Sequence, residues 1–118
     1  MRRKNVDEDD IESRPVWDEN FANELIGKLV LVGITRCNSD GSVDRHEQFF
    51  GIVQSAHKSA GVFLDLEGTR AGCRYNLPPD LRSYFKASPG NYCLRSTNEI
   101  VTNPNFTVTF TVHKKPKD

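Results

Sequence analysis

The feature that most constrains the fold is a strict two-residue alternation near the end of the chain. Phe106, Val108, Phe110 and Val112 alternate with Thr107, Thr109 and Thr111. Because successive side chains of a β-strand point to opposite faces, this tract predicts a strand with one apolar face and one threonine face. Such a face has to be buried against other elements, so the tract favours a mostly β domain.

Shorter extended tracts precede it, and clusters of turn residues separate them. The predicted strands cover residues 28–36, 43–56, 62–66, 73–76 and 92–95. The first is apolar on both faces, which predicts burial on both sides. In the second, the alternation breaks at Phe49-Phe50-Gly51, which indicates a β-bulge or sharp bend. Pro78 and Pro79 exclude a central strand, so one helical turn is expected to start at Pro79, and 96–105 is expected to be a connection.

A short helix is predicted over residues 15–26. Pro15 suits a first helical turn, and Gly27 suits the position just past a helix end. Trp17, Phe21 and Leu25 recur every four residues and form one apolar stripe. We expect this stripe to cover the second apolar face of residues 28–36.

Together these elements predict a small antiparallel barrel of five to six strands with a short N-terminal helix. An SH3-like barrel fits the local hairpins best, and an OB-like barrel is the alternative, although it would need a fuller helix. The expected organisation is a disordered acidic segment at 1–13, one β-barrel domain at 14–113, and a basic tail at 114–118.

The charge of the chain is balanced overall but unevenly distributed. Its 118 residues hold 16 basic and 16 acidic side chains, yet residues 1–26 carry a net charge of −4 and the remainder +4. The acidic segment is expected to be a solvated tail, and the alternative is that it covers a basic surface of its own domain. No secretory signal or long apolar stretch is present, so we expect a cytoplasmic protein that does not enter a membrane.

Three tracts resemble a small bacterial family of uncharacterised single-domain β proteins. They are Gly27-Lys28-Leu29-Val30-Leu31-Val32-Gly33, Leu77-Pro78-Pro79-Asp80-Leu81 and Pro89-Gly90-Asn91-Tyr92-Cys93-Leu94-Arg95-Ser96-Thr97. The resemblance spans residues 27–112. It implies a compact bacterial domain and transfers neither a function nor catalytic residues.

Motifs that would indicate catalysis or a bound metal are missing from the sequence. The glycines form no phosphate-binding loop, and no nucleophile elbow occurs. Cys37, Cys73 and Cys93 are expected to be free and mostly buried, because neither a disulfide framework nor zinc-ligand spacing is present. We therefore expect no cofactor, no metal site and no catalytic residue.

The remaining candidates are binding functions. Non-catalytic interaction with an unidentified protein partner is the first hypothesis, through exposed edge strands or the stiff Pro78-Pro79 segment. The alternative is single-stranded RNA or DNA, bound by basic and aromatic side chains that interleave in the second half of the chain. Those candidate binding residues are Arg70, Arg74, Arg82, Tyr84, Lys86 and Arg95. A pI of 6.8 weakens the nucleic-acid hypothesis, since such domains usually exceed about 9. An enzyme is the third and least favoured class, and the sequence leaves the oligomeric state open.

Overall fold

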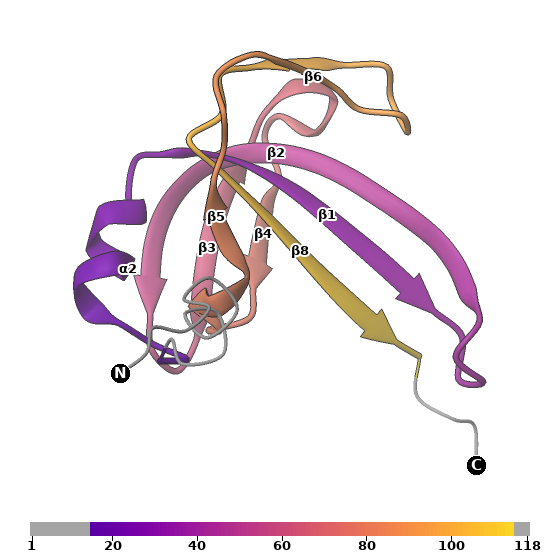
Figure 1. Ribbon diagram of the computed structural model, residues 1–118, viewed down its shortest axis with the longest axis horizontal. Helices are drawn as coiled ribbons and strands as arrows, with labels where there is room; N and C mark the ends of the chain where they lie inside the picture. The colour runs from indigo at the N-terminus through magenta and orange to yellow at the C-terminus, as the bar shows by residue number, and fades with distance from the viewer. Residues whose placement is uncertain (1–14, 115–118) are drawn as a thin grey trace, which may run out of the picture.

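The computed structural model describes residues 15–114, which form a curved mixed sheet with one helix and a separate two-stranded hairpin (Figure 1). The predicted disorder of residues 1–13 and most of the basic tail lie outside the described residues. The elements are α2 (Glu19–Leu25), β1 (Leu29–Cys37), β2 (Val43–His57), β3 (Gly61–Leu66), η1 (Gly68–Arg70), β4 (Arg74–Leu77), η2 (Leu81–Ser83), β5 (Tyr84–Lys86), β6 (Asn91–Cys93), β7 (Ile100–Thr102) and β8 (Phe106–His113). Over the described range, no helix has the length and apolar character needed to cross a membrane.

The mostly β class is confirmed, but the closed antiparallel barrel is wrong. The large sheet has the order β4-β3-β2-β1-β8-β5, and β8 runs parallel to β1. Within residues 15–114, β4 and β5 end the sheet without pairing with each other. Alternation identifies a strand but says nothing about its neighbour or direction, so the parallel pairing of β8 was not visible. The sheet order confirms neither an SH3-like nor an OB-like topology.

The core lies on one face of the sheet, which we call the core face. Val30, Val32 and Ile34 of β1 are almost fully buried there, together with Leu25 of α2. Phe21 of α2 packs edge-on to two further core rings. The predicted apolar stripe is thus confirmed as a packing surface, but it covers the core face rather than the second face of β1.

The helix is shorter than predicted because Asp18 caps it. The Asp18 carboxylate accepts hydrogen bonds from the backbone N–H groups of Asn20 (3.0 Å) and Phe21 (3.4 Å). A side chain that satisfies these first N–H groups defines the start of a helix. The helix therefore begins at Glu19, and Pro15 precedes it.

The predicted irregularity of β2 is displaced. β1 and β2 stay in register through Phe49-Phe50-Gly51. The shifts lie on either side: in the pairing with β1 between Arg36 and Cys37, and in the pairing with β3 between Val53 and Ser55. Gly51 has another role, because a Cβ there would overlap the backbone of Asp65 and Leu66 in β3. This glycine allows the two strands to approach closely.

The hairpin of β6 and β7 lies over the opposite face of the sheet, which we call the hairpin face (Figure 1). Two hydrogen bonds anchor it: the Arg95 N–H donates to Gln48 Oε1 (2.7 Å), and the Thr69 N–H donates to Glu99 Oε2 (2.7 Å). Hydrogen bonds from Thr97 and Thr69 lower the pKa of the Glu99 carboxyl. The short strands β5 and β7 were not predicted from the sequence. The expectation that the cysteines are mostly buried is wrong for Cys73 and Cys93, which are exposed.

Candidate interaction surface

Beyond its centre the large sheet narrows to three strands, which we call the distal ribbon. It comprises residues 33–37 of β1, 43–48 of β2 and 109–113 of β8. β3 pairs with β2 only from Gly51 onward, and β5 pairs with β8 only up to Val108. The ribbon therefore extends from the body (Figure 1), and among the described strands both of its outer edges lack a neighbour.

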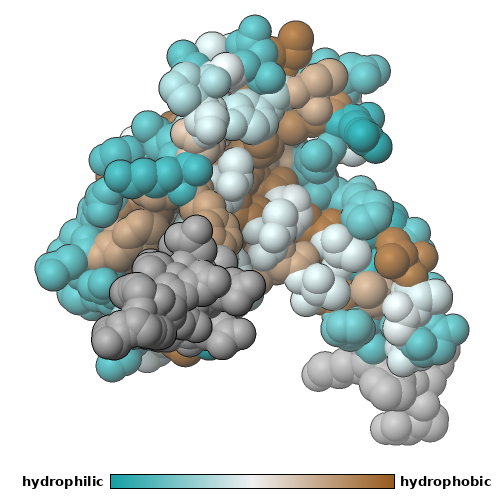
Figure 2. Space-filling model, in the orientation of Figure 1, coloured by the Kyte–Doolittle hydropathy of each residue, from teal (hydrophilic) through white to brown (hydrophobic). Residues whose placement is uncertain are grey.

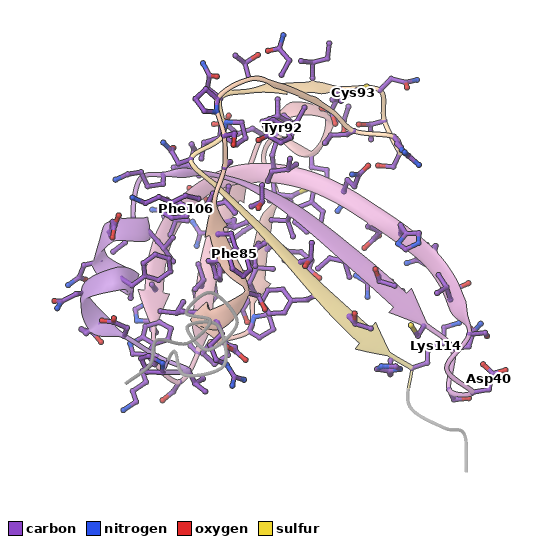
Figure 3. The ribbon with its side chains drawn as sticks, in the orientation of Figure 1. Asp40, Phe85, Tyr92, Cys93, Phe106 and Lys114 are labelled. Atoms are coloured by element: carbon purple, nitrogen blue, oxygen red, sulfur yellow. The ribbon has the colours of Figure 1, made fainter. Side chains whose placement is uncertain are left out.

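The end of the ribbon is a tight turn between β1 and β2. The Asp40 carboxylate accepts hydrogen bonds from the Ser42 N–H (2.9 Å) and hydroxyl (2.7 Å), which lower the pKa of Asp40. Asp40 marks this end in Figure 3, where Lys114 lies nearby at the end of β8. Lys114 forms an ion pair with Asp44 of β2 (3.5 Å), so all three strands are joined near the turn.

The edge formed by β2 carries charged side chains. Three of the four residues at positions 44–47 of this strand are charged: Asp44, Arg45 and Glu47. Charged residues on an open edge oppose pairing with another strand, because pairing would desolvate them. This edge is therefore protected.

On the core face of the ribbon, the carboxylate of Glu47 lies close to three arginines. Glu47 Oε1 accepts from Arg36 Nε at 2.8 Å, and Glu47 Oε2 lies 3.7 Å from both Arg45 and Arg70. The hydrogen bond to Glu47 raises the pKa of Arg36. The Arg70 guanidinium also stacks over the Phe49 ring at 4.7 Å. The cluster fixes the ribbon against the body through η1.

The edge formed by β8 is different, because it has no charged side chain between Thr109 and Val112. The N–H of Lys114 donates to Cys37 of β1, while the carbonyl of Asn105 accepts from Ala87 beyond β5. Because peptide groups alternate along a strand, the N–H groups of Thr109, Thr111 and His113 point away from β1. In Figure 2, white and brown atoms run over the part of the ribbon formed by β8.

Two of the predicted binding residues, Arg70 and Arg74, lie at the β3–β4 side of the sheet. Arg70 belongs to the Glu47 cluster. Arg74 forms an ion pair with Asp65 of β3 (3.1 Å). Both guanidinium groups already contact a carboxylate, which leaves them less available to phosphate groups.

The other four predicted residues lie elsewhere. Arg82 pairs with Asp80 in its own turn (2.7 Å), Tyr84 is buried with 1% exposure, and Lys86 is exposed on β5. Arg95 follows β6 and lines a cleft on the hairpin face. The six residues thus form two groups at opposite ends of the sheet, near β4 and on η2–β5, with Arg95 apart from both on the hairpin face. The buried Tyr84 ring offers no surface for stacking.

Sequence reasoning missed the cluster of Arg36, Arg45 and Glu47. A signal was available, since Arg36 continues the phase of Val30, Val32 and Ile34 toward the core face. Which strand lies beside it could not be read from that phase. Within residues 15–114, no three His, Cys, Asp or Glu side chains gather as metal ligands do.

Comparison of the chain with protein-family models, with curated proteins and with solved structures gave no match.

Proposed function

We propose that the protein is an interaction module that receives an extended segment of another protein as an added strand along β8. The observation that carries the proposal is the outer edge of β8 from Thr109 to His113, which no described strand pairs. Strand addition of this kind obtains affinity from backbone hydrogen bonds and specificity from alternate side chains.

The contrast between the two edges of the distal ribbon supports this choice. Proteins protect open edges with charges, bulges or coverings because exposed edges pair with other chains. The β2 edge carries Asp44, Arg45 and Glu47, whereas the β8 edge presents threonine, phenylalanine and valine. An unprotected edge beside a protected one is the expected arrangement when pairing at the first is functional.

The side chains of β8 define the partner's pattern. On the core face, Phe110 is half-buried and Val112 is 40% exposed, so the added strand gains apolar contacts there. On the hairpin face it meets Thr109 and Thr111. Cross-strand pairs of like polarity are the favourable ones, so the partner segment alternates apolar and hydroxyl-bearing residues over about five positions.

Peptide selection against two matched variants tests the proposal. Thr111→Pro removes one outward N–H while sparing the hydrogen bonds to β1, and proline is tolerated at such edge positions. Thr111→Val keeps the N–H and is the control. Peptides selected on the wild-type protein should alternate as described. Both variants lose the Thr111 hydroxyl, so the comparison is between them: the peptides should bind Thr111→Pro about tenfold more weakly than Thr111→Val, the loss of about one hydrogen bond.

Three results would overturn the proposal. The first is a selection that yields no peptide, and the second is peptides that bind Thr111→Pro as well as Thr111→Val. The third is a wild-type dimer that Thr111→Pro dissociates in analytical ultracentrifugation, because a second copy of this chain would then occupy the edge.

A further inference from the structure

A cleft with a mostly apolar lining and several polar groups lies between the β6–β7 hairpin and the hairpin face of the distal ribbon. The cleft is half open to solvent and has a volume of about 520 Å³, within the range of about 300–1,000 Å³ usual for small-molecule sites. The lining residues are Gly33, Ile34, Thr35, His46, Glu47, Gln48, Arg95, Ser96 and Thr109. Gly33 contributes no side chain, so the centre of the floor stays open.

The functional groups of this cleft are hydrogen-bond donors. Arg95 and His46 supply N–H groups, and Thr35, Ser96 and Thr109 supply hydroxyls. The Thr35 hydroxyl lies 3.2 Å from His46 Nδ1. In the tautomer that accepts the Thr35 proton at Nδ1, His46 Nε2 carries a hydrogen and is the donor that faces a ligand in place of Thr35.

No carboxylate side chain balances these donors. Glu47 contributes to the lining, but it follows His46 on β2 and so points to the opposite face, where its carboxylate binds Arg36. Of the six arginines in residues 15–114, five have a carboxylate within 4 Å, and Arg95 is the exception. A guanidinium presents a planar fork of donors that matches the oxygens of a carboxylate or phosphate.

The wall that carries Arg95 is held in place. Its backbone N–H donates to Gln48 Oε1 on the floor of the sheet (2.7 Å). Glu99, across the same hairpin, bonds Thr69 of η1. An Arg95 substitution leaves both anchors intact, because neither uses its side chain.

We infer that this cleft binds a small molecule through an oxyanion group, either phosphate or carboxylate, with Arg95 as the main ligand and His46 opposite it. The inference does not depend on strand addition at β8, since it needs no protein partner and its main ligand, Arg95, lies outside that edge, although Thr109 borders both sites.

Titration of the full chain with inorganic phosphate, and separately with acetate, tests the inference by ¹⁵N NMR at constant ionic strength. Saturable shifts should concentrate at Thr35, His46, Ser96 and Thr109. Arg95→Ala should weaken binding at least tenfold. Arg74→Ala, which removes another exposed arginine that does not line the cleft, should bind as wild type does.

Each arm has a defined meaning. Saturation by phosphate supports a phosphate-bearing ligand, and saturation by acetate alone supports a carboxylate. Absence of saturation by both, equal binding by Arg95→Ala, or equal weakening by Arg74→Ala would overturn the inference.

Discussion

Replacing Gly51 by alanine should destabilise the protein, while the same change at Gly33 should not. At Gly51 a Cβ would overlap the backbone of Asp65 and lie 2.9 Å from Leu66 Cα, so β3 has to move. Forced shifts of packed structure cost typically about 1–3 kcal/mol. At Gly33 the nearest atom to the new Cβ is Thr109 Cγ2 at 3.4 Å, an ordinary contact.

The two glycines make a matched pair, because they lie on adjacent strands and receive the same substitution. Alanine also restricts the unfolded chain, which favours folding by about 0.4–1 kcal/mol where no strain arises. In urea denaturation, the free energy of unfolding of Gly33→Ala should therefore be higher than that of wild type or within about 0.5 kcal/mol of it. The free energy of unfolding of Gly51→Ala should be about 1–3 kcal/mol lower than that of wild type. Equal stabilities, or the reverse order, would refute the close approach of β2 and β3.

Three further predictions concern single side chains. Burial raises the pKa of Tyr84, so the unfolded chain loses this proton at lower pH than the folded protein does. The free energy of unfolding should therefore fall above about pH 10, and it should fall less steeply in Tyr84→Phe, when denaturation is measured as a function of pH. Asp18→Ala should lower the free energy of unfolding by about 1 kcal/mol, while Asp18→Asn, which still accepts a hydrogen bond, should retain most of it. Glu47→Gln should cost about 1–2 kcal/mol at low salt, because three arginines lose their shared carboxylate, and less in 1 M NaCl; Glu24→Gln, on the exposed face of α2, is the control, and a salt-independent loss would contradict the ion-pair explanation.

The sequence predicted those parts of the fold that depend on local pattern. The long strands β1, β2, β3 and β8 follow from alternation, and α2 follows from its apolar stripe. The three-residue strands β5 and β7 are too short to show a period, and they exist because a neighbour pairs with them. The parallel pairing of β8 with β1 depends on the path of the chain through the β6–β7 hairpin, which no local signal encodes.

The candidate site was less accessible to sequence reasoning for a related reason. An open edge is defined by which strands stop, and the ends of β3 and β5 relative to β2 and β8 are tertiary facts. The arginines were visible as residues, but their availability depends on carboxylates distant in sequence, as Glu47 is from Arg70. Arg95 differs from the other predicted arginines only once those pairings are known.

Amide hydrogen exchange along β8 shows whether the outer edge of this strand is open, and it requires no partner. If the outer edge is open, the amides of Thr109, Thr111 and His113 exchange quickly, while those of Phe110 and Val112, bonded toward β1, exchange slowly. We expect this alternation of fast and slow exchange in the isolated protein. Uniformly slow exchange would mean that the edge is already covered, and uniformly fast exchange would mean that β8 does not form a stable edge; both would contradict the account.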